Sequence, residues 1–274
     1  ARGREFVDAL IDAEPNRLDR AFRDNLYAHT EGHPLFTVEL MRDFRDRGVL
    51  TAAPDGALIL ASAVDWAAIP ARVEGVVAGR LSGLPKNLRE LLDVAAVEGN
   101  EFTAELAARV QSRDGREVVR ELSGHLQDAL QLVRGLDARR VGAQRLSRYR
   151  FSHQLVQKYL YGALDAVERS YLHESVGLGL EALYGPRAEE IAPQLARHFE
   201  VSEIPDKARL YLGRAGAQAA AAIANEAALE FLNRALALTP AQAVEDRIEL
   251  LLRREGVYSA LGRREPQRAD LDAL

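Results

Sequence analysis

Apolar residues recur at helical spacing along most of the chain, and runs of turn-forming residues divide this pattern into segments. Within residues 1–30 the spacing predicts two short helices, with a break at Glu14-Pro15-Asn16. Gly32 then permits a backbone turn, and Pro34 suits the first position of a helix. We therefore expect a helix from Pro34 to about Arg47, closed by a glycine at position 48.

A short hairpin is the next predicted element. Pro54-Asp55-Gly56 is a turn signal, and the apolar run from Ala57 to Leu60 predicts a strand after it. Residues 1–66 are accordingly expected to form one mainly helical segment with a small hairpin.

The middle of the chain has the pattern of a winged-helix domain. From Ile69 to Leu84 the apolar residues recur at helical spacing, and the same spacing resumes after Pro85. Two further helices are expected over Glu101–Val110 and Glu117–Leu130. Between Gln131 and Tyr149 the pattern changes to an arginine-rich loop with glycines, flanked by short apolar runs. The last three of these helices, followed by a two-stranded hairpin, have the order of a winged helix, so we assign residues 67–168 to this fold.

The remainder, residues 169–274, is predicted to be helical, with breaks at Gly185-Pro186, Ile204-Pro205 and Thr239-Pro240. Helix pairs separated by short breaks are typical of an α-solenoid.

A tetratricopeptide (TPR) unit of about 34 residues that ends at Pro240 would place Gly216, Ala228 and Ala235 where its two helices approach closely. Leu232 stands in place of the large aromatic residue expected between the alanines. A second, incomplete unit would begin near Ile248. The alternative is an ordinary alanine-rich helical hairpin.

Composition narrows the functional classes. The chain has 274 residues, 47% of them hydrophobic, which suffices for a substantial core in two or three domains. No apolar run reaches the ~18 residues of a membrane span, and no secretory signal opens the chain, so we expect no membrane partner. The absence of cysteine excludes disulfides, thiolate zinc sites and cysteine nucleophiles, and is consistent with a cytoplasmic location.

The familiar catalytic and nucleotide motifs do not occur in the sequence. There is no Gly-Lys pair, which excludes a Walker-type phosphate loop within the chain. Neither Gly-x-Gly-x-x-Gly nor Gly-x-Ser-x-Gly occurs, so a dinucleotide fold and a nucleophile elbow are not expected. The carboxylates are scattered, and none forms a recognisable acid/base pair. We therefore expect no catalytic residues.

His153 is the histidine with the most informative position. Ser152 is a good N-cap for the amphipathic helix that follows, which would put His153 at a helix N-terminus, where anions bind favourably. A histidine there stays neutral unless a phosphate or carboxylate shares the site. The alternative is a histidine packed beneath the helix.

The other histidines give weaker signals. His29 and His33 lie four residues apart, but Gly32 and Pro34 interrupt the helix that would align them for a metal, so we expect no metal site. We interpret His173 and His198 as surface or packing residues.

The arginine-rich hairpin and the helix before it favour opposite conclusions about DNA. The hairpin region carries six arginines, Arg139 and Arg140 among them, and only one acidic residue, Asp137. A DNA phosphate backbone would attract this net positive charge. The candidate recognition helix carries Glu117, Glu121 and Asp128 instead, which phosphates would repel. The net charge of −5 likewise argues against bulk affinity for nucleic acid.

Three groups of residues, in this order, resemble the part of STAND signal-transduction ATPases that follows the nucleotide-binding core, as in bacterial predicted ATPases and large transcriptional regulators. They are Thr30-Glu31-Gly32-His33-Pro34 with the residues up to Leu40, then Ile69-Pro70 with Leu84-Pro85, and Tyr149 to Tyr161. The resemblance covers nearly the whole chain and implies a mainly α protein: residues 1–66 a helical lid segment, 67–168 a winged helix with a small β-hairpin wing, and 169–274 the start of a TPR-like solenoid.

The resemblance also implies roles for particular residues. Gly32, His33 and Pro34 would belong to the lid over the nucleotide, with Pro34 against the adenine. His153 would correspond to the histidine that reaches the β-phosphate of ADP in related ATPases. Ser152 and Gln154 replace the methionine and aspartate that flank it there, which puts the aspartate's supporting role in doubt.

On this interpretation the chain is a regulatory and interaction segment that hydrolyses nothing itself. ADP or ATP with magnesium would be held by a core upstream of Ala1, and a protein or small-molecule inducer would bind the helical repeats. The lack of an initial methionine, with Met41 inside a predicted helix, adds to the expectation of an excised piece. Two alternatives stay open: an interaction scaffold without a nucleotide role, and a DNA-binding regulator that works through Arg139 and Arg140.

Overall fold

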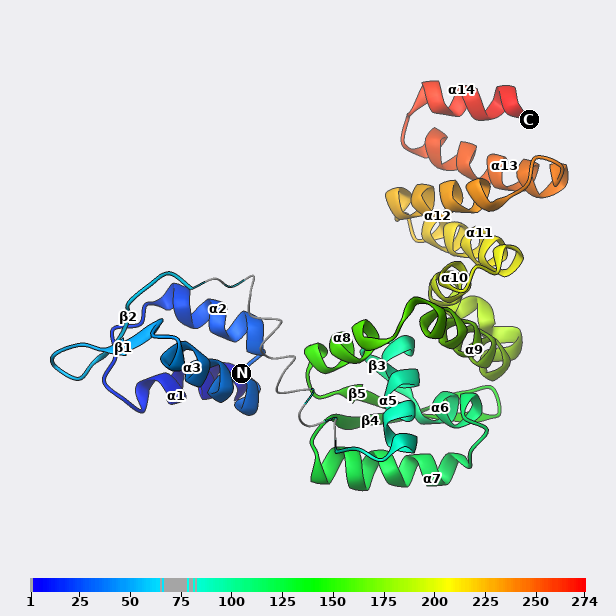
Figure 1. Cartoon of the computed structure of the whole chain (residues 1–274). Coiled ribbons are helices and arrows are strands. Elements are labelled where there is room, and N and C mark those ends of the chain that lie inside the picture. The colour runs from blue at the N-terminus through cyan, green and yellow to red at the C-terminus, as the bar shows by residue number, and fades with distance from the viewer. Residues whose placement is uncertain (1, 65, 67–77, 79–80, 82) are drawn as a thin grey trace. The chain divides into compact units, whose positions relative to one another are not determined.

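The computed structural model of the chain describes residues 2–64, 66, 78, 81 and 83–274 (Figure 1). These residues form a mainly helical fold with small antiparallel sheets, which confirms the predicted fold class. Two compact units are present, one of residues 1–101, 119–136 and 149–163, the other of residues 102–118, 137–148 and 164–274. The helix predicted from Ile69 to Leu84 lies almost entirely outside the described residues.

The N-terminal part of the first unit follows the predicted pattern closely. Its elements are α1 (Arg2–Asp12), α2 (Arg20–Thr30), α3 (Pro34–Asp46), β1 (Leu50–Ala52) and β2 (Leu58–Leu60). The strands pair antiparallel with Leu50 opposite Leu60, as the turn signal between them predicted. Asp19 caps α2, because its side chain accepts a hydrogen bond of 2.8 Å from the Phe22 N–H.

Aromatic rings fill the core of this part. Trp66, the only tryptophan of the chain, lies 5.6 Å from the ring of Phe22 and 5.7 Å from that of Phe44, measured between ring centroids. Both phenylalanines are buried, and rings at these distances attract one another beyond the gain from burial. Trp66 is therefore placed to report on the packing of α2 and α3.

The middle segment departs from prediction at two points. Its elements are α5 (Lys86–Glu98), β3 (Glu101–Thr103), α6 (Ala104–Val110), α7 (Gly115–Arg120), a π-helix η2 (Glu121–Ala129), β4 (Val133–Val141), β5 (Gln144–Phe151) and α8 (Gln154–Ala163). The helix expected over Glu101–Val110 is wrong in its first three residues, which form β3 beside β5. The helix expected over Glu117–Leu130 instead consists of α7 and the wider turns of η2.

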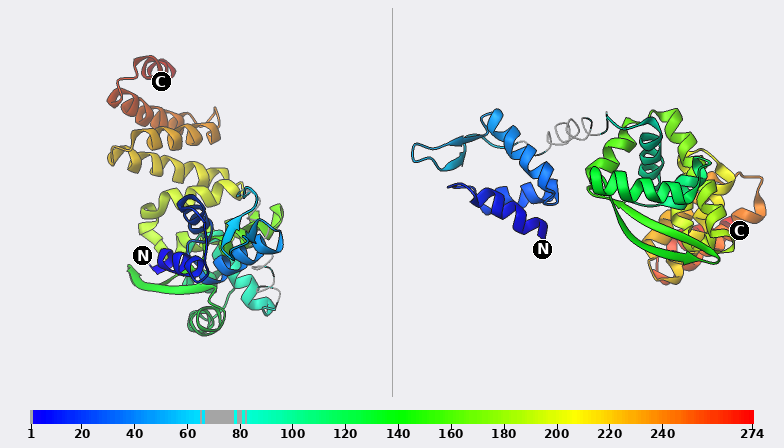
Figure 2. Two further views of the ribbon diagram at one scale, coloured as in Figure 1. Left: turned by 90° about the vertical axis from the view of Figure 1, so that its left-hand side faces the viewer. Right: turned by 90° about the horizontal axis from the view of Figure 1, so that it is seen from below.

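The sheet explains the first of these differences. Its strand order is β3-β5-β4, so the first strand along the chain is an edge strand that pairs with the last. The Phe151 N–H donates a hydrogen bond of 3.0 Å to the Asn100 carbonyl just before β3. The long β4–β5 hairpin, visible in Figure 2, lies where the sequence predicted a two-stranded hairpin.

Helices make up the rest of the chain and stack in chain order in Figures 1 and 2. They are α9 (Ala166–Tyr184), the 3₁₀-helix η3 (Gly185–Ile191), α10 (Ala192–Val201), α11 (Pro205–Ala221), α12 (Asn225–Leu238), α13 (Val244–Ala260) and α14 (Arg264–Ala273). The predicted breaks coincide with helix ends: α11 begins at Pro205, and α12 ends two residues before Pro240. No helix among the described residues is long and apolar enough to cross a membrane.

The small residues singled out for the helical pair α11/α12 lie where the two helices touch. Ala228 and Ala235 are completely buried, and a Cβ added at Gly216 would lie only 2.7 Å from Cγ of Leu232. A methyl group does not fit at that distance, so the glycine allows this close approach. The close approach of α11 and α12 at these small residues was predicted from the sequence.

One polar network joins α9 to α11. The Tyr211 hydroxyl donates a hydrogen bond of 2.7 Å to Oε1 of Glu181, and Lys207 Nζ lies 2.5 Å from Oε2 of the same carboxylate. Burial and this hydrogen bond both raise the pKa of the Tyr211 phenol.

Replacing Tyr211 by phenylalanine removes that bond and keeps the ring, so we expect Tyr211→Phe to lower the free energy of unfolding by about 1 kcal/mol. Urea unfolding followed by circular dichroism measures this loss. The exposed Tyr171 provides a control, because Tyr171→Phe should leave stability unchanged. Equal stability of Tyr211→Phe and the parent chain would contradict a stabilising role for the hydroxyl.

Candidate functional site

The turn between α2 and α3 brings together most of the residues that the sequence marked. Glu31 and Gly32 both have left-handed backbone angles, φ 50° and φ 69°, after which His33 is extended and Pro34 opens α3. Thr30 and Thr37 are completely buried beside it, and the Thr37 hydroxyl lies 3.1 Å from the Thr30 hydroxyl. Short polar contacts therefore hold the turn in one conformation.

His153 occupies the N-cap position of α8, which corrects one expectation from the sequence. The helix begins at Gln154, and the imidazole itself serves as the cap: Nδ1 accepts a hydrogen bond of 3.0 Å from the Leu155 N–H. Ser152 was expected to do this and does not. A ring nitrogen can replace a hydroxyl here because the cap requires only an acceptor within reach of the first N–H groups.

The other ring nitrogen connects His153 to the turn. Nε2 lies 2.7 Å from the carbonyl oxygen of Thr30. Since Nδ1 accepts a backbone N–H, the proton resides on Nε2, which donates it to Thr30. The side chain is 3% exposed, and burial lowers the pKa of His153, which the charge of Glu31 partly opposes. The imidazole is therefore neutral at pH 7, with both nitrogens engaged.

The predicted site residues thus lie together within the first unit. The His33 and His153 rings are 5.9 Å apart between centroids, and Phe36 packs edge-on against His153 at 4.5 Å. Gly32 is buried, His33 is half-buried and Pro34 is exposed. The cluster combines the two imidazole rings with the aromatic ring of Phe36, an arrangement that can bind or position a group.

Carboxylates lie close to much of the basic hairpin. Arg148 forms an ion pair of 3.2 Å with Asp137, and Arg150 lies 4.0 Å from Glu101. The pKa of Glu190 is lowered by its bond to Arg187 and also by the charge of Arg139. Arg139 and Arg140 are exposed, but the charge of Arg139 already acts on a carboxylate of the same chain.

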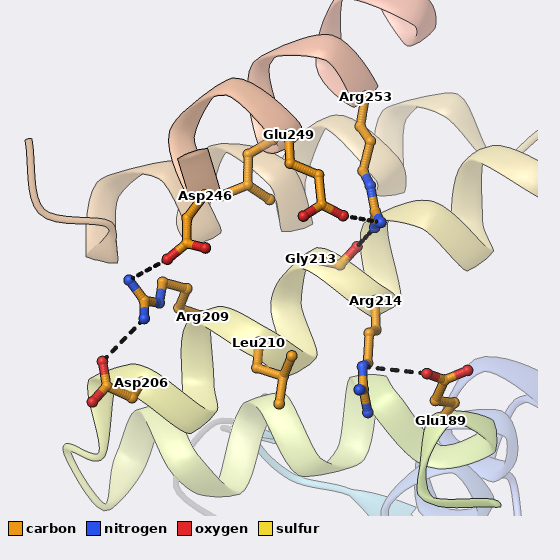
Figure 3. A pocket seen from close by; sticks show the side chains of 10 residues that line it. Glu189, Asp206, Arg209, Leu210, Gly213, Arg214, Asp246, Glu249 and Arg253 are labelled. Carbon is orange, nitrogen blue, oxygen red and sulfur yellow. Dashed lines mark hydrogen bonds and ion pairs between the residues drawn. The ribbon is translucent and has the colours of Figure 1, made fainter. Parts of the chain in front are cut away.

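A groove lies between η3, α11 and α13 (Figure 3), with a volume of about 510 Å³. Leu210, Gly213 and Leu250 supply its uncharged surface. Charged side chains surround this surface: Glu189, Asp206, Arg209, Arg214, Asp246, Glu249 and Arg253. This volume is within the range of small-ligand sites.

Sequence reasoning missed one buried pair in the second unit. His173 of α9 and His198 of α10 are both completely buried, with 3.0 Å between their Nδ1 atoms. Burial lowers the pKa of His173 to about 4 and that of His198 to about 3, and the charge of Arg197 acts in the same direction on both. Their spacing in sequence gives no helical or strand signal, so only the packing of the two helices reveals the pair.

The described residues contain no group of three or more histidines, cysteines, aspartates and glutamates that could hold a metal ion. His29, which lies four residues before His33 in the sequence, stacks on Trp66, with 5.2 Å between ring centroids.

Comparison of the chain with protein-family models, with curated proteins and with solved structures found no match.

Proposed function

We propose that the chain is the regulatory and interaction segment of a multidomain STAND ATPase and couples nucleotide state to the binding of a partner or inducer. In this proposal residues 1–66 are the lid, residues 67–168 a winged helix, and residues 169–274 a TPR-like repeat region. The chain catalyses nothing alone, and a separate cytoplasmic core supplies the phosphate loop and the magnesium-bound nucleotide.

The observation that carries the proposal is the hydrogen bond from Nε2 of His153 to the Thr30 carbonyl, 2.7 Å long, beside His33 and Pro34. Two segments more than a hundred residues apart in sequence meet at the residues expected to contact a nucleotide. The exposed ring of Pro34 remains available for an adenine.

This geometry supports a switch based on competition for one proton. The Nε2–H of His153 serves the Thr30 carbonyl, and a β-phosphate oxygen would compete for it. A charged acceptor forms the stronger hydrogen bond, so ADP would draw His153 away from Thr30. The hydrogen bond from His153 to the nucleotide and the one from His153 to Thr30 would then be mutually exclusive, which gives the two states that a regulator requires.

The test uses the protein in which this segment follows its nucleotide-binding core. His153→Ala should release a fluorescent ADP analogue about tenfold faster, because a hydrogen bond to a charged group contributes roughly 1.5–3 kcal/mol. Stopped-flow fluorescence measures the release rate. The exposed His125 is the matched control, and His125→Ala should release the analogue at the parent rate.

A second candidate function, an interaction scaffold without any nucleotide role, is favoured by the groove of Figure 3. The same stopped-flow experiment separates the two functions. Unchanged ADP release from His153→Ala would reject the nucleotide switch and leave the scaffold.

A further inference from the structure

The groove between η3, α11 and α13 is lined by more carboxylates than guanidinium groups (Figure 3). Arg209 lies between two carboxylates, 3.3 Å from Asp206 and 3.0 Å from Asp246. In this way one guanidinium of α11 is shared by two acids, one on its own helix and one on α13.

The other two arginines of the groove are also engaged. Arg214 lies 3.4 Å from Glu189, and Arg253 lies 2.5 Å from Glu249 and donates a hydrogen bond of 3.1 Å to the Gly213 carbonyl. Every guanidinium that lines the groove therefore has a partner already. The arginine side chains, Arg209, Arg214 and Arg253, are only 23%, 36% and 38% exposed, which limits the access of an anionic ligand to them.

The carboxylates of the groove keep oxygen atoms that can still accept hydrogen bonds from a ligand. Four acids line the groove against three arginines, and each acid contributes a single oxygen to the ion pairs described. The side chains of Asp246, Glu249 and Glu189 are 51%, 63% and 61% exposed, so a ligand can reach their remaining oxygens. The groove consequently favours a cation over an anion.

The dimensions of the groove favour a polypeptide segment. Its lining on α11 runs from Asp206 to Arg214, about 12 Å at 1.5 Å per residue. That length matches about three to four residues of extended chain at roughly 3.3 Å each. Leu210, which is 45% exposed, and the side-chain-free Gly213 leave an apolar floor between the charged walls.

We propose that this groove binds a short extended segment of a protein partner in which arginine or lysine alternates with aliphatic residues, and that it rejects acidic segments. The cations would take the spare oxygens of Asp246, Glu249 and Glu189, and an aliphatic side chain would cover Leu210. The inference rests on the proposed role of the helical repeats in partner binding and specifies the chemistry of that partner.

Fluorescence anisotropy of labelled peptides on the whole chain tests it. The probes are a hexapeptide of alternating arginine and leucine and its counterpart with glutamate in place of arginine. At low ionic strength the arginine peptide should bind at least tenfold more tightly, and added salt should weaken it. Equal binding of both peptides, or no binding of the arginine peptide, would overturn the proposal.

Variants locate the binding. Asp246→Asn with Glu249→Gln frees Arg209 and Arg253 from these acids, so affinity for the arginine peptide should fall about tenfold while the glutamate peptide gains. Leu210→Lys places a cation in the groove and should also block the arginine peptide. All three side chains are exposed, so the fold should tolerate the changes, and circular dichroism verifies this.

The control is Glu230→Gln, which removes an exposed carboxylate that pairs with Arg234 on α12, outside the groove. It should bind the arginine peptide like the parent chain. An equal loss of affinity in this control and in the groove variants would show nonspecific charge attraction and would reject the site. The ADP-release experiment changes His153 and the peptide experiment changes the groove. A negative result in one of them therefore does not decide the other.

Discussion

Substitution of Gly32 by alanine will destabilise the first unit by about 2–5 kcal/mol, because the new methyl group meets a backbone that cannot withdraw without moving a helix. A Cβ at this position would lie 2.2 Å from the carbonyl oxygen of Gly3 in α1. The residue also has φ 69°, which an alanine adopts at a cost of roughly 1–2 kcal/mol. Urea unfolding followed by the fluorescence of Trp66 measures the effect.

Gly48 is the matched control for this prediction. Its φ is 72°, nearly the same as that of Gly32, but a Cβ there would have no atom within 4 Å. Gly48→Ala should therefore incur only the backbone cost, and the difference between the variants isolates the contact with α1. Equal losses in the two variants would show that the close approach of Gly3 and Gly32 contributes nothing.

The Gly32 variant also connects the fold to the proposed switch. Thr30 precedes Gly32 by two residues and accepts the hydrogen bond from His153. If the turn shifts to admit a methyl group, that carbonyl moves as well. Hydrogen exchange of the amides in α1 and at the start of α8 should then increase together in Gly32→Ala and stay at parent values in Gly48→Ala.

Local signals in the sequence predicted the helices and the hairpins well. Pro34 at the first position of α3 and the breaks at Pro205 and Pro240 mark helix ends because proline and glycine act through their own backbone preferences. Strand β3 was missed for the opposite reason. Three residues carry too little periodicity, and only pairing with β5, some fifty residues later, makes them a strand.

In the candidate site, too, the sequence predicted the features that depend on local residues and not those that depend on packing. The composition of the turn, Thr30 to Pro34, is a local signal, and its conformation followed from Gly32. The identity of the cap did not follow, since Ser152 and His153 are both able acceptors and the choice depends on where the imidazole packs. The contact of His153 with Thr30 and the pairing of His173 with His198 depend on helices meeting in space, which spacing along the chain does not encode.

Acidification from pH 7 to pH 5 will lower the stability of the second unit by about 2–4 kcal/mol through the buried pair His173 and His198. In the unfolded chain both imidazoles bind protons near pH 6.5. In the folded chain burial holds the pKa of His173 at about 4 and that of His198 at about 3. The unfolded state therefore binds more protons across this window, so stability falls as pH drops below 6.5 and levels off below the folded values.

Chemical unfolding monitored by circular dichroism at both pH values measures this dependence. The matched variant carries His173→Asn and His198→Asn, because an asparagine amide can keep a hydrogen bond near the Nδ1 position and does not titrate. Its stability should change much less between pH 7 and pH 5 than that of the parent chain. His153, whose pKa is also lowered, remains in both proteins and cancels from the comparison. If parent and variant lose stability equally on acidification, the carboxylates rather than this histidine pair control the acid response of the fold.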